Sequence, residues 1–272
     1  MAPPLLGPPQ SCPLPGAGMK REENYNLRKL GEIAVHTNTY KRARDKAIEN
    51  AMAAFRISKK PYLAISGGKD SVAMAGIVNE AAKSIGRDYI LWCHVSDASY
   101  PGTEETVIAT GERLNRQVIL DRSPVSAFDV VGQQSAKQFG KKGYFFEAIA
   151  RFVRAGGYDL AFVGVRAAES ARRKKAARVH GELFHSNIPT ACWRSHPILW
   201  FHVEHVAAAL IEFDLPIHPI YEKIAVNNES IRLGYITALD LVHRGTVVFL
   251  RVNYPELYQK LITAYPEAAQ YG

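Results

Sequence analysis

The sequence predicts an α/β fold in which a doubly wound parallel sheet of about five strands carries helices on both faces. Four short apolar runs, at 62–65, 89–95, 117–120 and 159–163, have the near-continuous hydrophobicity of parallel strands that are buried on both faces. Segments with helical spacing of apolar residues lie between these runs, and a glycine-containing turn follows the first and the fourth. Since ligands bind beyond the carboxyl ends of parallel strands, the sequence predicts a ligand site at these turns.

The composition bounds the class of protein and the class of partner. The chain has 272 residues, of which 47% are hydrophobic, enough for one large α/β domain with a sizeable core. The formal net charge of +8 favours an anionic partner, such as a nucleotide, a sulfated or phosphorylated molecule, or a nucleic acid. The sequence contains no run of about twenty apolar residues, so it predicts no membrane span and no membrane partner.

The cysteines indicate the compartment. The sequence has three, Cys12, Cys93 and Cys192, with no C-x-x-C pair among them. An odd, dispersed set argues against a disulfide framework and is typical of the reducing cytoplasm.

Two segments precede the first strand. Residues 1–18 are rich in Pro and Gly and lack the features of a signal peptide, so we predict a disordered tail, with Met19 as an alternative start. Residues 19–58 show helical spacing with an interruption near 37–39, which predicts two helices.

The stretch 61–71, which reads PYLAISGGKDS, is the most informative part of the chain. Its candidate site residues are consecutive: Ser66, Gly67, Gly68, Lys69, Asp70 and Ser71. The glycines permit a tight turn, and the N–H groups at the start of the following helix, together with the helix dipole, favour an anion. The lysine adds a positive charge and the serines add hydroxyl donors. The spacing is not that of a Walker A loop, which needs four residues between its first glycine and the Gly-Lys pair.

This loop resembles the pyrophosphate-binding loop of the N-type ATP pyrophosphatases, the PP-loop family, whose pattern is SGGxDS. In that family ATP is split between its α- and β-phosphates, giving an adenylylated intermediate and pyrophosphate. The resemblance implies that ATP and Mg²⁺ are the cofactors. An ordinary glycine-rich turn is the alternative, but it does not explain Lys69 and Asp70 between two serines.

The segment after the second strand carries two further candidates. Asp97 and Thr103 lie in a stretch that resembles the corresponding segment of sulfonucleotide-reductase-like PP-loop proteins, in which an acidic residue and Pro-x-Thr precede a helix. The resemblance implies that both residues bind the nucleotide. Cys93, inside the strand, is predicted to be a core residue.

The stretch after the fourth strand, GVRAAESARRKK, resembles the G-x-R-x-x-E-S-x-x-R segment of the phosphoadenylyl sulfate reductase family and of the nucleotide-binding subunit of bacterial ATP sulfurylase. The resemblance places Gly164, Arg166 and Glu169 at the nucleotide. It also implies that Arg166 and Arg172 hold phosphate or sulfate oxygens, a task that suits the two-pronged guanidinium. Lys69 joins these two arginines as a catalytic candidate, and Glu169 either orients Arg166 or assists magnesium.

The likeness extends over about residues 60–225, through a predicted loop at 188–194, a helix at 203–213 and the closing run 216–221. His202 and His205 are spaced as on one helix face, but no Cys or carboxylate ligand is close in sequence, so no metal site is predicted. Sulfonucleotide reductases carry a catalytic cysteine near the C-terminus, and this sequence has none after Cys192. The thiol-dependent reduction of that branch is therefore not expected.

Taken together, these motifs divide the chain into the tail, the N-terminal helices, a PP-loop nucleotide-binding domain at 59–225 and a helical extension at 226–272 that carries an Arg232–Gly234 pair. We predict a cytoplasmic enzyme that adenylylates an unidentified anionic acceptor and releases pyrophosphate. One alternative is a nucleic-acid or nucleobase modification enzyme that uses the same activation, and another is a non-catalytic sulfonucleotide-binding protein. The sequence leaves open whether the chain forms a homo-oligomer.

Overall fold

A computed structural model describes residues 26–124, 126–128, 144–224 and 246–271 of the chain. The predicted tail at 1–18 and the predicted Arg232–Gly234 pair lie outside the described residues.

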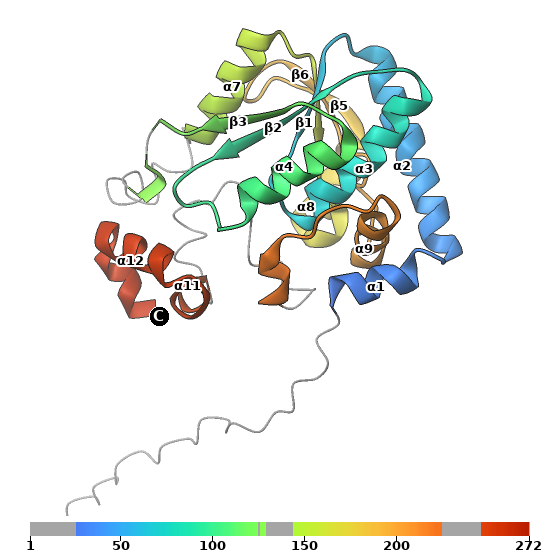
Figure 1. The fold of residues 1–272 in the computed structure, drawn as a ribbon. Coiled ribbons are helices and arrows are strands. Elements are labelled where there is room, and N and C mark those ends of the chain that lie inside the picture. The colour runs from blue at the N-terminus through green and yellow to red at the C-terminus, as the bar shows by residue number, and fades with distance from the viewer. Residues whose placement is uncertain (1–25, 125, 129–143, 225–245, 272) are drawn as a thin grey trace, which may run out of the picture.

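The described chain contains a six-stranded sheet in the order β3-β2-β1-β4-β6-β5 (Figure 1). The strands are β1 (Pro61–Ala64), β2 (Ile90–Val95), β3 (Val118–Arg122), β4 (Leu160–Val163), β5 (Leu183–Ser186) and β6 (Cys192–Ser195). All neighbours pair in parallel except β5, which runs antiparallel to β6 at the edge. The predicted doubly wound α/β fold is therefore confirmed, with six strands in place of about five.

One part of the sequence interpretation was wrong. Residues 188–194 were expected to form a loop, but β6 begins at Cys192 and pairs with both β4 and β5. The sequence of β6, CWRS, is too polar to be recognised as a strand, and β6 lies beside the edge strand of the sheet.

The helices of the described chain are α1 (Leu27–Ala34), α2 (Asn38–Ile57), α3 (Lys69–Ser84), α4 (Thr103–Leu114), α7 (Tyr144–Gly156), α8 (Ala171–His180), α9 (Val203–Glu212), α11 (Thr246–Asn253) and α12 (Pro255–Ala264), with short 3₁₀ turns η1 (Ala167–Glu169), η2 (Pro219–Glu222) and η3 (Pro266–Tyr271). The predicted break between two N-terminal helices is confirmed, because Thr37 follows α1 and caps α2 by accepting from the N–H of Tyr40 at 3.3 Å. Among the described helices, none combines the length and the apolar character needed to cross a membrane.

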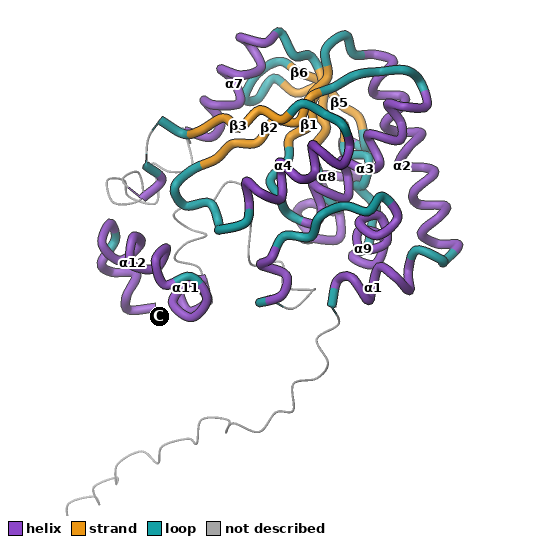
Figure 2. Tube along the Cα trace, viewed as in Figure 1, coloured by secondary structure: helices purple, strands orange, loops and turns teal. Residues whose placement is uncertain are grey.

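The two faces of the sheet pack against different helices, as alternating side chains require. Leu63 and Leu91 point into the larger core, where they meet residues of α2, α3, α4 and α9. Their sequence neighbours Tyr62 and Trp92 point to the other face and pack with α7. Figure 2 shows the short strands between these helical layers.

The order of the strands creates a switch point between β1 and β4. From β1 the chain moves outward through β2 and β3, and it then returns to β4 on the other side of β1. Because β1 and β4 are parallel neighbours, the turns that follow them emerge side by side at one edge of the sheet. These are the two turns in which the sequence concentrates glycine and charge.

The C-terminal helices α11 and α12 belong to a second apolar cluster. Leu250 and Leu257 pack there with Tyr100, which follows β2, and with Ile220 in η2. The end of the chain is thereby joined to the same edge of the sheet.

Candidate functional site

The turn after β1, residues 66–71, is called the glycine loop below. Gly67 has a φ of +72°, a left-handed conformation that side chains rarely adopt. A Cβ atom at this position would also lie 3.2 Å from the backbone oxygen of Thr103. Both constraints require glycine here, and α3 begins two residues later at Lys69.

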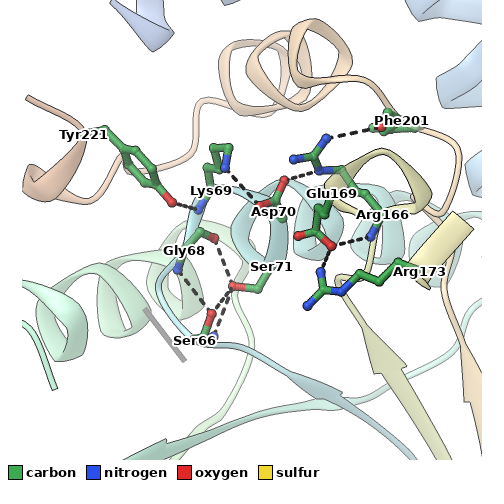
Figure 3. A network of polar contacts seen from close by, with 10 residues as sticks. All are labelled: Ser66, Gly68, Lys69, Asp70, Ser71, Arg166, Glu169, Arg173, Phe201 and Tyr221. Atoms are coloured by element: carbon green, nitrogen blue, oxygen red, sulfur yellow. Dashed lines mark hydrogen bonds and ion pairs between the residues drawn. The ribbon is translucent and has the colours of Figure 1, made fainter. Parts of the chain in front are cut away.

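Two serine hydroxyls hold the shape of the glycine loop (Figure 3). Ser71 Oγ donates to the carbonyl of Gly68 at 3.0 Å and accepts from the N–H of Ser66 at 3.1 Å. Ser66 Oγ lies 3.1 Å from Ser71 Oγ, and it accepts from the N–H of Gly68 at 3.4 Å. Since the proton of Ser71 already points to Gly68, Ser66 donates in the pair of hydroxyls. The two serines thus fix the loop.

Lys69, Asp70 and Arg166 form a buried chain of charges behind the loop. Asp70 Oδ2 accepts from Lys69 Nζ at 3.2 Å, and Asp70 Oδ1 accepts from Arg166 Nε at 2.5 Å. Lys69 is 7% exposed and Arg166 only 1%. Arg166 Nη1 also donates to the carbonyl of Phe201 at 3.4 Å. The arginine is therefore fixed from both sides within the protein.

Glu169 links this chain of charges to α8. Its carboxylate accepts from the backbone N–H of Arg166 at 3.1 Å and forms an ion pair with Arg173. Two roles were expected for Glu169, to orient Arg166 or to assist magnesium, and the geometry matches the first. The five residues Lys69, Asp70, Arg166, Glu169 and Arg173 carry one positive charge in excess.

Gly164 lets the turn after β4 approach the start of α3. A Cβ atom there would lie 3.0 Å from Ser71 Cα and 3.1 Å from Ser71 N, so a larger residue would collide with backbone. This close approach brings the two halves of the switch point together.

Tyr221 completes the site and was not singled out from the sequence. Its hydroxyl accepts from the backbone N–H of Lys69 at 2.9 Å, at the first residue of α3. The Lys69 ammonium lies 5.5 Å from the centroid of the Tyr221 ring. The only sequence signal was its position at the end of the closing run 216–221.

Thr103 lies beneath the glycine loop and bonds to a second unexpected residue, His218. The N–H of Ile220 donates to His218 Nδ1 at 3.0 Å, so the proton of the neutral ring is on Nε2. His218 Nε2 is 3.1 Å from Thr103 Oγ1 and donates to it. Burial lowers the pKa of His218 to about 4, with Glu105 opposing the shift, so the ring is neutral at pH 7.

We expect acid to destabilise the protein through His218. Its pKa in the unfolded chain is the ordinary 6.5. Between pH 6.5 and 4 the unfolded state therefore binds a proton that the folded state does not bind. The free energy of unfolding should fall over this window, by at most roughly 3 kcal/mol from this group. Urea unfolding of wild type and His218→Gln at several pH values measures the effect. The variant should show a smaller loss, and identical profiles would contradict this assignment.

Asp97 points away from the glycine loop. Its carboxylate accepts from Ser126 Oγ at 2.5 Å and from the N–H of Ala127 at 2.8 Å. Asp97 also lines a cavity of about 560 Å³ between the β2–α4 turn and α12, together with Tyr100 and Glu105. The structure thus brings Thr103, but not Asp97, against the glycine loop.

Arg172 lies in the first turn of α8, where its side chain is exposed to solvent. Its neighbour Arg173, by contrast, belongs to the polar network of Figure 3 through Glu169. A role for Arg172 therefore has to involve a molecule that approaches α8 from solvent.

The two described cysteines are core residues of strands. Burial raises the pKa of Cys93 to about 12 and that of Cys192 to about 11, so both are thiols at neutral pH. Cys192→Ser should leave the predicted release of pyrophosphate from ATP unchanged, as a steady-state assay beside wild type would measure. An inactive variant with a wild-type melting temperature would assign chemistry to this thiol.

Within the described ranges, no group of three or more His, Cys, Asp or Glu residues is placed to hold a metal ion. His202 and His205 do lie near each other, with ring centroids 5.7 Å apart. His205 packs in addition against Phe201, which is typical of a histidine that is partly buried in a core.

Comparison with known proteins gives one family and several solved structures. The sequence model of the phosphoadenosine phosphosulfate reductase domain matches residues 60–234, which is more than half of the chain. None of the curated proteins compared with this sequence matches it.

The solved structures share the fold at low sequence identity. The U34-tRNA thiolase NcsA from Methanococcus maripaludis, with its 4Fe-4S cluster, is 14% identical with a TM-score of 0.51, over 85% of this chain and 82% of that one. FMN adenylyltransferase from Candida glabrata, in complex with FMN and the ATP analogue AMPCPP, is 10% identical with a TM-score of 0.50, over 72% and 68%. Phosphoadenylyl-sulfate reductase from Candida auris is 14% identical with a TM-score of 0.47, over 76% and 93%.

Proposed function

Because the chain belongs to the phosphoadenosine phosphosulfate reductase domain family of the PP-loop superfamily, we propose that it adenylylates an acceptor at the expense of ATP. The β- and γ-phosphates bind at the glycine loop. An oxyanion of the acceptor attacks the α-phosphorus, the new P–O bond forms, and the bond to the β-phosphate oxygen breaks. Pyrophosphate leaves with the electron pair.

The observation that carries this proposal is the position of the glycine loop at the switch point. The positive end of the α3 dipole faces the space beyond β1, where the left-handed Gly67 keeps side chains out of the way. Lys69 adds a positive charge. Its ammonium has three N–H donors and uses one of them to donate to Asp70. This arrangement is suited to an anion that gains charge as it departs.

The buried arginine acts behind the loop. We assign Arg166 the role of fixing Asp70, which in turn holds Lys69, and of contributing its charge to the site from within the protein. Arg172, exposed on α8, is the candidate for direct contact with the nucleotide or the acceptor.

Magnesium does not fit a site made by these carboxylates alone. Both oxygens of Asp70 already accept from cations, and Glu169 is bonded to Arg166 and Arg173. Mg²⁺ that arrives with ATP would be held mainly by phosphate oxygens, as is common for this ion. The proposed step depends on the protein's own cations.

The chemistry of the reductase branch is not part of the proposal. Both described cysteines lie buried in strands and have raised pKa values, so neither is suited to attack a sulfonucleotide. A non-catalytic sulfonucleotide-binding protein is the competing function, because the same loop would hold a nucleotide without turning it over.

The test is to incubate the full-length protein with ATP labelled at the α-phosphate and, separately, at the γ-phosphate, together with a panel of acceptors. We expect labelled pyrophosphate from the γ-labelled ATP and a labelled adenylyl group on one acceptor. Release of inorganic phosphate instead would contradict cleavage between the α- and β-phosphates. Tight nucleotide binding without turnover on any acceptor would favour the competing function.

A further inference from the structure

We propose that the outer face of α8, together with Trp200, is a docking surface for single-stranded nucleic acid. Binding of the strand does not depend on the proposed function. The proposal rests on that function only where it assigns the acceptor group to the bound strand. The surface itself is defined by the exposed cations Arg172, Lys174, Lys175 and Arg178 and by the adjacent indole.

The cations of α8 share its solvent face. Ala177 is 5% exposed and packs with Leu199, which defines the inner side of the helix. At 100° per residue, Arg172, Lys175 and Arg178 lie about 100–160° around the helix from Ala177. Lys174 lies nearer to Ala177, at about 60°, and its side chain is exposed as well. The helix sequence, ARRKKAARVH, contains no acidic residue.

This charge pattern is unfavourable for the helix itself. Cations in a first turn oppose the helix dipole, and Arg172, Arg173 and Lys174 all lie there. Of these three, the described structure pairs only Arg173 with an acidic residue, which is Glu169. A bound polyanion would relieve the repulsion among the others, so the pattern is better explained by binding than by stability.

A buried histidine beside α8 is affected by the cations of this region. His196 lies behind the end of the helix, with its ring 5.4 Å from that of Phe184, which in turn contacts His180. Burial lowers the pKa of His196 to about 4, and the nearby charges of Arg194 and Arg173 lower it further, so the ring is neutral at pH 7.

Trp200 supplies what a nucleic acid needs beyond charge. It is 48% exposed, and its Nε1 donates to Glu182 Oε1 at 2.8 Å, two residues beyond the end of α8. Its neighbour Leu199 packs on Ala177 of the same helix. A partly exposed indole held beside a basic helix can stack an unpaired base, which favours a single strand over a duplex, an acidic peptide or a lipid surface.

The docking surface is connected to the site. Glu169 bonds to the backbone of Arg166 at the switch point and to Arg173 of α8, as Figure 3 shows. A strand lying on α8 would therefore pass the glycine loop at the N-terminal end of the helix, where one of its nucleotides could present an oxygen for adenylylation.

The first experiment measures binding of fluorescein-labelled, mixed-sequence single-stranded RNA and DNA to the full-length protein across a salt series, without ATP. The test variant is Lys174→Gln/Lys175→Gln/Arg178→Gln. Its matched control, Lys29→Gln/Arg56→Gln/Lys83→Gln, removes the same charge from exposed positions on α1, α2 and α3. We expect the test variant to bind at least about tenfold more weakly and to lose about 2 from the slope of log K against log salt, at about 0.7 per phosphate contact.

The second experiment separates stacking from charge. Trp200→Ala should weaken binding by about five- to a hundredfold without changing the salt slope, whereas Trp200→Phe, which keeps a ring but loses the bond to Glu182, should bind nearly as wild type. Thermal unfolding of both variants shows whether any loss comes from the fold. A Phe variant that is folded and as weak as the Ala variant would overturn the stacking role.

The controls decide the class of partner and keep this inference separate from the proposed function. Equal affinity for a duplex, for polyglutamate or for anionic vesicles would overturn the proposal, as would equal losses in the test and control triples. Strand binding through α8 without pyrophosphate release on any acceptor would leave this surface intact and refute the proposed function. Pyrophosphate release with a small acceptor but no strand binding would support the proposed function and refute the docking surface. Comparison of the affinities for RNA and DNA shows whether the surface prefers ribose or deoxyribose.

Discussion

Replacing Lys69 by alanine is expected to lower the rate of pyrophosphate release by a factor of about ten or more, because a charge-assisted contact contributes roughly 1.5–3 kcal/mol. The reason lies in the geometry of the loop. Lys69 is the first residue of α3, and Asp70 holds its ammonium beside the turn. The measurement is steady-state release of pyrophosphate from ATP at saturating acceptor.

The effect should concentrate in kcat, since the charge that Lys69 faces grows as pyrophosphate departs. Lys83→Ala, which removes an exposed lysine from the last turn of the same helix, is the matched control and should remain active. If Lys69→Ala turned over at the wild-type rate, the glycine loop would not be the pyrophosphate site.

The second large effect is expected from the pair Asp70 and Arg166. Asp70→Ala leaves the guanidinium of Arg166, 1% exposed, without its carboxylate. Breaking one side of a buried ion pair costs about 3–5 kcal/mol of folding free energy. Urea unfolding monitored by tryptophan fluorescence measures this loss.

Two further variants test the pair. The double variant Asp70→Ala/Arg166→Met removes both charges of this pair and should recover much of the lost stability, because the buried guanidinium is no longer left without its carboxylate. Lys69 loses its bond to Asp70 in the single and in the double variant, so that loss cancels in the comparison. Arg166→Lys keeps the charge but loses the planar fork that spans Asp70 and the carbonyl of Phe201, so its turnover should fall well below wild type. Wild-type activity of Arg166→Lys would show that charge alone is needed.

The fold could be predicted wherever local sequence decides the structure. β1, β2 and β4 have apolar runs because both of their faces are covered, and the order of elements then implies a parallel sheet. β5 and β6 could not be found in this way. Their sequences, LFHS and CWRS, are polar, which the position at one edge of the sheet permits because side chains there are only partly buried or exposed in β5 and in the middle of β6.

The same distinction applies to the site. The glycine loop is contiguous in sequence, so its residues could be predicted together, but the internal use of the Ser66 and Ser71 hydroxyls could not. The pairing of Asp70 with Arg166 joins residues that are 96 positions apart. Tyr221 and His218 reach the loop only through the tertiary fold, and the closing run 216–221 that contains them does not reveal these contacts.

The bond between the N–H of Lys69 and the hydroxyl of Tyr221 spans 152 positions of the chain. During synthesis, β1 and the start of α3 leave the ribosome long before η2 does. A nascent chain that has emerged only as far as α8 can pair its first four strands, yet it lacks the tyrosine that completes the start of α3. The start of α3, and with it the glycine loop, is therefore completed only after η2 has emerged.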